Sequence, residues 1–246
     1  MTANRPPSEP PALPIEGIET LEDFARRAGH DLNEPARKIS AFANLLQHKL
    51  ASDLEAETAQ ALNFLEDAAQ RQHGLIDAVL HWLKAATRPL QMEPVDLNPV
   101  LAEVMAHLTE EGLTDGVEVD VSDLPTVMGD RTLITDVYLA LLRNALTFKA
   151  DLPLEVRVSQ GRPAFGDASL LIRDNGIGIP EAFYERVFEP FERLHPREAY
   201  PGHGLGLAFC KMALERMGGQ IRLGTPVRPS DTPAGICVIV NLKLAD

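Results

Sequence analysis

The sequence contains few cysteines, few aromatic residues and no excess of positive charge. Only two cysteines, Cys210 and Cys237, occur among 246 residues, so a disulfide framework is not expected and a reducing cytoplasm fits. Lys and Arg number 23 against 36 Asp and Glu, which gives a formal net charge of -13. Because nucleic-acid binders usually present a basic face to phosphates, nucleic acid is not expected as a partner.

Long apolar runs are also missing from the chain. No stretch approaches the roughly 18 apolar residues of a membrane helix, and the first segment, MTANRPPSEPPALP, lacks the apolar centre of a signal peptide. The sequence therefore predicts a cytoplasmic protein without a membrane segment. Apolar residues still make up 45% of the chain, enough for a packed core in one large or two modest domains.

A heptad pattern follows residues 1–16, which are rich in Pro, Ser and Glu and are predicted to be a disordered tail. Apolar or small residues recur at steps of three and four at Ile18, Leu21, Ala25, Ala28, Leu32, Pro35, Ile39, Phe42 and Leu46. We call this row of residues the seam. Such a repeat predicts a long helix that packs against another helix.

A second helix is expected after the segment ASDLE, where Ser52 and Glu55 have the spacing of a capping box. It should end near Arg88-Pro89, because proline disfavours a helical residue before it. The two helices predict an antiparallel hairpin over residues 17–89, with Trp82 in its core. A lone hairpin has little to bury against, so we expect a homodimer in which two hairpins form a four-helix bundle.

Mixed helices and strands follow a segment, RPLQMEPVDLNP, that reads as a linker. Period-two alternation and apolar runs predict strands at 117–121, 154–159, 169–174, 219–223 and 235–244. Helical patterns cover 96–111, 129–150, 180–191 and 206–217. Asp96 and Asp130 are expected as N-caps of the first two helices. Strands interspersed with helices predict a layered α+β domain over residues 90–246.

Three features of this second domain suggest ligand chemistry. RDNGIGIP, residues 173–180, ends a strand with an acid and two glycines, which let a backbone approach a ligand closely. PGHGLGLAFC, residues 201–210, leads a glycine-rich loop into a helix N-terminus, which can bind an anion. Asn144 places an amide on a mostly apolar helix face, where its oxygen could bind Mg²⁺. Each feature alone also fits a plain turn, a flexible loop or a surface residue.

Taken in order, five segments resemble the H, N, G1, F and G2 boxes of sensor histidine kinases. These are HDLNEPARKI, LLRNALTF, RDNGIGIP, FEPFERLH and GHGLGL. The resemblance extends from about residue 17 to the end of the chain. The forms HDLxEP and RLHPREAYPG are most similar to the kinases attached to phytochrome-like photoreceptors.

The resemblance implies ATP and Mg²⁺ as cofactors and an ATP-binding α/β sandwich of the histidine kinase/Hsp90-like type. His30 would accept the phosphoryl group, and Asp31 would orient its imidazole. The nucleotide would be held by Asn144, which would also bind Mg²⁺, by Phe148, Asp174, Gly176 and Gly178, and by a mobile lid containing Gly202, Gly204 and Gly206. A response regulator would receive the phosphoryl group on an aspartate. The input would come from a sensor protein in trans or from a longer chain that includes this module.

The heptad register supports the assignment of His30 independently. With Ile18 at position a, His30 falls at f and Asp31 at g, so an outward-facing imidazole could meet a nucleotide carried by another domain. Pro35 removes a helical hydrogen bond from the Asp31 carbonyl. We interpret it as a hinge beside the histidine; a passive kink is the alternative.

Four positions depart from the common pattern of the family. Ala140 replaces a polar residue one turn before Asn144, which favours phosphotransfer over ATP hydrolysis. Thr147 stands where a phosphate-contacting lysine is frequent, and Lys149 or Arg143 would have to substitute. His203 replaces a small hydroxyl residue in the lid. Glu34 stands where kinases with phosphatase activity often have Thr or Asn, so phosphatase activity is not predicted.

Two other functions fit parts of the pattern. One is a dimeric histidine phosphotransfer protein whose ATP-binding domain is vestigial, which Ala140 and Thr147 leave open. The other is a scaffold that binds ATP without transferring a phosphoryl group. Labelled ATP distinguishes them: a kinase takes the label from ATP, a phosphotransfer protein takes it only from a phosphorylated partner, and a scaffold takes none.

Overall fold

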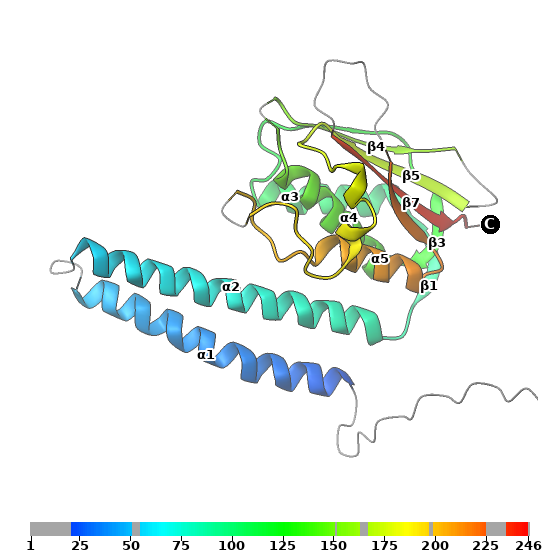
Figure 1. Ribbon diagram of the computed structural model, residues 1–246. Helices are drawn as coiled ribbons and strands as arrows, with labels where there is room; N and C mark the ends of the chain where they lie inside the picture. Colours follow the sequence, from blue (N-terminus) through cyan, green and yellow to red (C-terminus); the bar gives the residue numbers. More distant parts are fainter. Residues whose placement is uncertain are drawn as a thin grey trace, which may run out of the picture. The chain divides into compact units, whose positions relative to one another are not determined.

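The computed structural model describes residues 21–50, 55–150, 152–162, 167–196, 199–224 and 235–245, and their side chains except those of 21–26, 28, 30 and 50. The chain forms two compact units, Met1–Gln70 and Arg71–Asp246. The first contains helix α1 and the beginning of helix α2, and the second contains the rest of α2 and all the strands (Figure 1). The expected tail, residues 1–16, and the expected cap at Ser52 lie outside the described residues.

The first unit is a helical hairpin, as the sequence predicts. Helix α1 spans Leu21–Leu50 and α2 spans Ala56–Thr87, so α2 ends directly before Arg88-Pro89. Helix α1 continues through Pro35. Gln47 donates a side-chain hydrogen bond of 2.7 Å to Asn63 across the hairpin.

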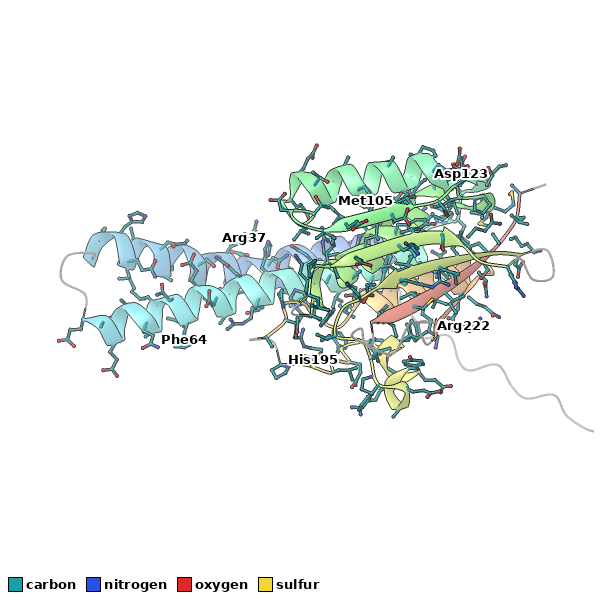
Figure 2. The ribbon with its side chains drawn as sticks, turned by 90° about the horizontal axis from the view of Figure 1, so that it is seen from above. Arg37, Phe64, Met105, Asp123, His195 and Arg222 are labelled. Carbon is teal, nitrogen blue, oxygen red and sulfur yellow. The ribbon has the colours of Figure 1, made fainter. Side chains whose placement is uncertain are left out.

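Among the described side chains of α1, the buried ones are not those of the seam. The buried positions are small or polar and lie seven residues apart at Gly29, Ala36 and Ala43, with Asn33 beside them. On α2 the buried residues of this unit are Leu62 and Ala69. The seam residues Leu32, Ile39, Phe42 and Leu46 are exposed, Phe42 by 64%. Phe64 of α2, labelled in Figure 2, is 62% exposed. A single chain therefore leaves these four described seam residues of α1 uncovered.

The second unit is an α/β sandwich. Its helices after α2 are α3 (Leu97–Glu110), α4 (Arg131–Thr147) and α5 (Gly206–Arg216). Its strands are β1 (Met92–Asp96), β2 (Glu118–Val121), β3 (Thr126–Asp130), β4 (Glu155–Gln160), β5 (Asp167–Asp174), β6 (Gln220–Gly224) and β7 (Ile236–Lys243). Two short 3₁₀ turns, η1 (Glu181–Phe183) and η2 (Arg186–Phe188), lie between β5 and α5.

Five strands form one sheet in the order β2-β4-β5-β7-β6. Only β2 and β4 pair in parallel, and the other neighbours are antiparallel. Helices α3, α4 and α5 cover one face of this sheet (Figure 1). Strands β1 and β3 form a separate antiparallel pair, which a bridge between Val127 and Leu244 connects to the end of the chain.

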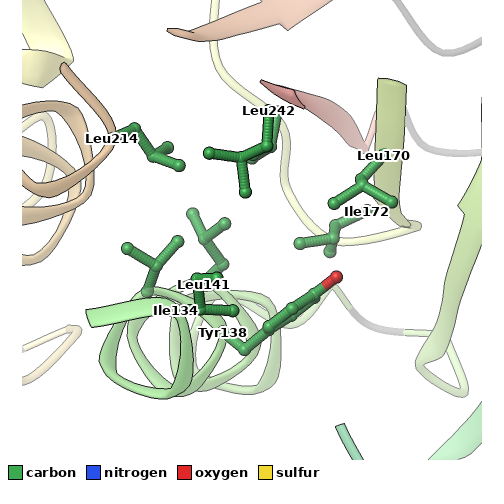
Figure 3. Close-up of a pocket in the computed structure, with 9 residues that line it drawn as sticks. Ile134, Tyr138, Leu141, Leu170, Ile172, Leu214 and Leu242 are labelled. Carbon is green, nitrogen blue, oxygen red and sulfur yellow. The ribbon is translucent and has the colours of Figure 1, made fainter. Parts of the chain in front are cut away.

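The core lies between α4 and the sheet, because both elements turn apolar residues toward each other. Strand β5 buries every second residue, from Ala168 to Asp174. Figure 3 shows Ile134, Tyr138 and Leu141 of α4 opposite Leu170, Ile172 and Leu242 of the strands, with Leu214 of α5 beside them. They enclose a cavity of only about 10 Å³. Burial raises the pKa of Tyr138, so its hydroxyl stays protonated.

Polar residues cap the helices where the sequence predicts. Asp96 accepts a hydrogen bond of 2.9 Å from the backbone N–H of Asn98, and Asp130 accepts one of 3.2 Å from Leu133. Asp130 is also bound by Arg88 through two hydrogen bonds of 2.6 and 2.9 Å. Arg216 of α5 donates to the backbone carbonyls of Ala85 and Arg88. The carboxy-terminal end of α2 is thus fixed to the sandwich.

Trp82 belongs to this sandwich, where it packs against the buried core of the second unit. The expectation of a place in the bundle core was wrong. Residue 85, one turn later, is a buried alanine of the same core. The apolar side of α2 therefore changes its partner along the helix, which periodicity alone does not reveal.

The structure corrects two expected elements. The expected linker after α2 contains strand β1, which pairs with β3, a strand that the sequence did not suggest. Pro94 fits there because a two-stranded sheet leaves one side of each strand free. Residues 180–191 do not form a helix but two 3₁₀ turns, since Pro190 holds Glu189 in an extended conformation with a ψ of 140°. Among the described helices, none is long and apolar enough to cross a membrane.

Candidate functional site

A cavity of about 380 Å³ opens in the second unit. Its walls come from α2, α4, the end of β5, the loop after β5 and the segment that leads into α5. Seven of the residues that the sequence predicts to hold a nucleotide line this cavity: Asn144, Phe148, Asp174, Gly178, Gly202, Gly204 and Gly206. Segments more than fifty residues apart in the sequence therefore meet around one space.

Asp174 forms the floor of the cavity at the end of β5. Its side chain is 6% exposed, and its Oδ1 accepts a hydrogen bond of 2.9 Å from the backbone N–H of Gly176. The next residue, Asn175, holds the turn by accepting from the Glu155 N–H at 2.8 Å and donating to the Pro153 carbonyl at 2.9 Å. The carboxylate is therefore held in a fixed position where it could accept a hydrogen bond from a bound base.

Gly176 and Gly178 are required by geometry. A Cβ atom at Gly176 would lie 2.2 Å from the carbonyl oxygen of Phe148, and that oxygen accepts the N–H of Ile177 at 3.1 Å. Gly178 has a φ of 72°, which side chains rarely tolerate. The turn after β5 is thereby packed directly onto the end of α4. Gly176 supports this floor from beneath, and Gly178 lines the cavity itself.

The last turns of α4 supply the polar wall. Asn144 is half-buried at the cavity, and its carbonyl accepts the Phe148 N–H at 3.1 Å. Ala140, one turn earlier, also lines the cavity, where it presents a methyl group and not a carboxylate. The Thr147 hydroxyl is directed to the Arg143 carbonyl at 2.7 Å.

The positive charge at the cavity comes from Arg193 and from Arg143, one of the two residues that the sequence suggested. Arg143 lines the cavity, but its guanidinium donates to both carboxylate oxygens of Glu111 at 2.7 and 2.8 Å. This pair lowers the pKa of Glu111. Lys149 is exposed and is not among the lining residues. Arg193 lines the cavity and donates to the carbonyls of Gly202 and Tyr200, the latter at 2.8 Å. It therefore organises the loop that it precedes.

An aromatic cluster covers the end of α4. The rings of Phe148 and Tyr200 have centroids 5.0 Å apart, and those of His195 and Tyr200 are 5.2 Å apart. His195, labelled in Figure 2, lines the cavity. The sequence suggested Phe148 alone, because the segment RLHPREAYPG carries no periodic signal that would bring His195 and Tyr200 to it.

The glycine loop closes another side of the cavity. Gly202 and Gly204 have φ values of 134° and 73°, and Gly206 opens helix α5. The carbonyl of Gly204 accepts the N–H of Phe191 at 2.9 Å, which ties the loop to the preceding turn. No side chain caps the start of α5, so its first N–H groups remain available to an anion.

The expected phosphoacceptor pair lies in the other unit. His30 and Asp31 are residues of α1; Asp31 is exposed, and the side chain of His30 is outside the described residues. Nothing described brings this pair to the cavity. Transfer between them would therefore depend on how the two units approach each other.

The described residues contain no group of three or more His, Cys, Asp or Glu placed to hold a metal ion. The donor set at the cavity is nevertheless compatible with Mg²⁺, since this ion is usually held by one or two protein oxygens together with phosphates and water. Asn144 is the side chain at the cavity that fits this role.

The carboxy-terminal half of the chain matches a known family. Residues 129–246 match the family described as histidine kinase-, DNA gyrase B-, and HSP90-like ATPase. This range contains every cavity residue named above. ATP is accordingly the ligand class that this match associates with the cavity.

Other matches are longer, and two of them extend over both units. The phytochrome-like protein Cph1 of Synechocystis is 33% identical over 204 residues, which are 82% of this chain and 27% of that protein. A solved structure of the mycobacterial sensor histidine kinase MprB is 30% identical, with a TM-score of 0.53, and covers 63% of this chain and 100% of that chain. Histidine kinase ThkA in complex with response regulator protein TrrA is 21% identical with a TM-score of 0.59, covering 92% of this chain and 62% of that one. The chain thus spans about a quarter of the length of the phytochrome relative.

Proposed function

Because the chain belongs to the sensor histidine kinases, we propose that it uses ATP to phosphorylate its own His30 and then transfers the phosphoryl group to an aspartate of a response regulator. The observation that carries this proposal is the cavity of the second unit. A buried carboxylate, an amide, an aromatic ring and a glycine loop meet there.

In this proposal the adenine end of ATP binds at Asp174. The fixed carboxylate accepts a hydrogen bond from the exocyclic amine, while Gly176 and Gly178 keep the floor free of side chains. Phe148 contributes the apolar surface beside the base. The acid therefore selects a base that carries a donor at that position.

The phosphates would lie toward the glycine loop. Backbone N–H groups of residues 202–206, the open start of α5 and the guanidinium of Arg193 provide donors and positive charge there. Asn144 would contribute its side-chain oxygen to Mg²⁺, which neutralises phosphate charge when it is bound. Arg193 would thus take the role for which the sequence suggested Lys149 or Arg143.

The chemical step would form a bond between an imidazole nitrogen of His30 and the γ-phosphorus, while the bond from that phosphorus to the bridging oxygen of ADP breaks. The imidazole must be neutral to attack, which an ordinary histidine largely is near pH 7. Asp31 would hold the other ring N–H and stabilise the positive charge that develops. Catalysis would rest on positioning and on charge neutralisation.

Two side reactions are expected to be weak. Ala140 offers no base to activate water, so ATP hydrolysis without phosphotransfer should be slow. Glu34 lies one turn after His30, and its carboxylate pairs with Lys38 at 2.6 Å. This ion-paired carboxylate would not replace the neutral Thr or Asn that kinases with phosphatase activity often have at this position, which disfavours phosphatase activity.

We also propose that the chain acts as a homodimer. The seam residues Leu32, Ile39, Phe42 and Leu46 are exposed in a single chain, whereas other residues of α1 are buried. Exposed apolar rows of this kind are usually covered by a partner. A second copy offers the same row, so two hairpins would bury both seams in a four-helix bundle.

Incubation with ATP labelled at the γ-phosphate tests the proposal. A kinase incorporates label that is stable in base and labile in acid, loses it in His30→Ala, and passes it to a purified receiver domain. Label acquired only from a phosphorylated upstream protein would instead indicate a phosphotransfer protein. Nucleotide binding without any label would indicate a scaffold, and either result contradicts the proposal.

A further inference from the structure

Helix α2 contains a glycine in its interior, at position 74 of Ala56–Thr87. Glycine is the least favourable residue in a helix interior after proline. The backbone gives no reason for it, since Gly74 is not among the residues with positive φ. A close neighbour is the remaining reason for glycine at this position.

That neighbour is His203 of the glycine loop. A Cβ atom at Gly74 would lie 2.9 Å from Nε2 of His203 and 3.5 Å from Cε1. The imidazole therefore rests against the bare Cα of α2. Its Nδ1 atom is shielded from solvent, so the ring is inserted rather than projecting into water. Both residues belong to the second unit.

The contact lies at the wall of the nucleotide cavity. Ala78, one turn after Gly74 on α2, lines the cavity together with His203 and Gly204. His203 is flanked by Gly202 and Gly204, both with positive φ, so the loop has little side-chain packing of its own to fix it. The contact with Gly74 adds to the hydrogen bonds that Arg193 and the Phe191 N–H make to the carbonyls of Gly202 and Gly204.

We infer that His203 is a positioning residue, and that Gly74 is a seat through which α2 sets the position of the glycine loop over the cavity. The inference rests on the proposed function of the loop in binding phosphates. A loop that is ordered before the nucleotide arrives loses less conformational freedom on binding, which raises affinity. Because α2 runs from the hairpin into the sandwich, a displacement of this helix would change nucleotide binding.

Gly74→Ala is the direct test. The added methyl meets the tip of a flexible side chain, so the helix can keep its place while the imidazole must move. Alanine is favourable in a helix, and we expect a melting temperature equal to or above that of the unmodified chain. The dissociation constant of fluorescent N-methylanthraniloyl-ADP should rise by roughly three- to tenfold. Gln72→Ala, an exposed position on the same turn, is the matched control and should change neither value.

A double-mutant cycle separates the seat from a direct role of the imidazole. His203→Ala should weaken binding as much as Gly74→Ala does, and the double variant should be no weaker than either single variant. Additive losses would overturn the inference. So would a loss in His203→Ala with none in Gly74→Ala, since His203 would then act on the nucleotide itself.

A nucleotide-free measurement separates this inference from the proposed function. The imidazole Cε1–H signal of His203, assigned by its loss in His203→Ala, should shift in Gly74→Ala and stay in place in Gln72→Ala. If the unmodified chain binds nucleotide but Gly74→Ala leaves the His203 signal in place, the inferred role of Gly74 is wrong and the proposed function stands. Failure of every variant to bind nucleotide would overturn the proposed function and the inference with it.

Discussion

At the scale of single residues, the site depends on positions where a different side chain would clash with its neighbours or lose a hydrogen bond. Asp174 is fixed by an N–H two residues away, and Gly176 is fixed by a carbonyl from another element. These contacts explain why the acid and the first glycine of RDNGIGIP stand two residues apart. Similar contacts at Asp130 and at Gly176 lead to two predictions about individual positions.

The first concerns the pH dependence of stability at Asp130. Burial would raise the pKa of this carboxyl, but hydrogen bonds from Arg88 and from the N–H groups of Gln91 and Leu133 outweigh it and lower the pKa to about 2. The ionised form therefore stabilises the fold fully above the ordinary pKa near 4 and loses this effect as the pH falls toward 2. The contribution is about 2 kcal/mol.

Asp130→Asn should lower the free energy of unfolding by about 3 kcal/mol at pH 7, because it leaves Arg88 largely buried without its partner charge. Urea unfolding at several pH values measures this. The difference between the two proteins should shrink below about pH 4. A difference that stays constant down to pH 2 would contradict the assignment of the stabilising charge to Asp130.

The second concerns Gly176→Ala. A methyl group there would lie 2.2 Å from a backbone oxygen, so the turn or the end of α4 must move. We expect the free energy of unfolding to fall by about 1–3 kcal/mol and ATP affinity to fall with it, as measured by thermal unfolding and by calorimetric titration. Gly206→Ala is the control for stability, since nothing lies within 4 Å of the added methyl. Equal melting temperatures for both variants would exclude this packing role.

The predictability of site residues from the sequence follows from how local their signals are. The residues Asp174, Asn144 and the loop glycines stand in short motifs, so they could be found. Arg193 and His195 lie in the quoted segment FEPFERLH, but the sequence assigned them no role, because they reach the site, with Tyr200, through the fold of a loop that has no periodic pattern. The seat at Gly74 could not be found either, because it joins positions 129 residues apart in the sequence.

At the scale of elements, helices were easier to predict than the small strands. Helix α4 is a long amphipathic segment with a capping aspartate, and both its start and its buried face were predicted. Strand β1 contains a proline and buries only Val95, so its sequence resembles a linker until β3 is beside it. The apolar spacing of residues 180–191 predicts a helix, but Pro190 interrupts it and two 3₁₀ turns form instead.

The role of Pro35 as a hinge within helix α1 remains a prediction. Helix α1 continues through it, yet the ring removes a hydrogen bond to the Asp31 carbonyl. If the residue is a hinge, Pro35→Ala should change the rate of phosphoryl transfer at least fivefold while the melting temperature stays the same or rises. Label-transfer kinetics and thermal unfolding measure the two effects. A large change in stability with unchanged transfer kinetics would indicate a passive kink.

At the scale of the whole molecule, the heptad repeat and the mixed α/β pattern predict two parts that divide between residues 89 and 90, whereas the compact units divide between Gln70 and Arg71. Which surface covers the seam could not be predicted from the sequence. Gly29, Ala36 and Ala43 lie beside the seam and are buried, whereas the large seam residues from Leu32 to Leu46 are exposed. Periodicity identifies an apolar stripe but does not say which chain covers it.

The homodimer can be tested at that stripe. Phe42→Glu places a charge in the proposed bundle core and should convert the protein to a monomer at micromolar concentration, as measured by light scattering after size-exclusion chromatography. Arg37→Glu changes an exposed residue at heptad position f and serves as the control (Figure 2). A dimer that survives Phe42→Glu unchanged would exclude the seam as the interface.

The central claim is that ATP bound in the sandwich phosphorylates His30 on the hairpin. Tandem mass spectrometry of the protein, after incubation with ATP and Mg²⁺ and digestion under alkaline conditions, tests it most directly. The account predicts a single phosphoryl group on His30, which Asp174→Asn reduces at least tenfold although α1 is unchanged. Phosphate on another residue, or none on His30 in a protein that binds ATP, would contradict it.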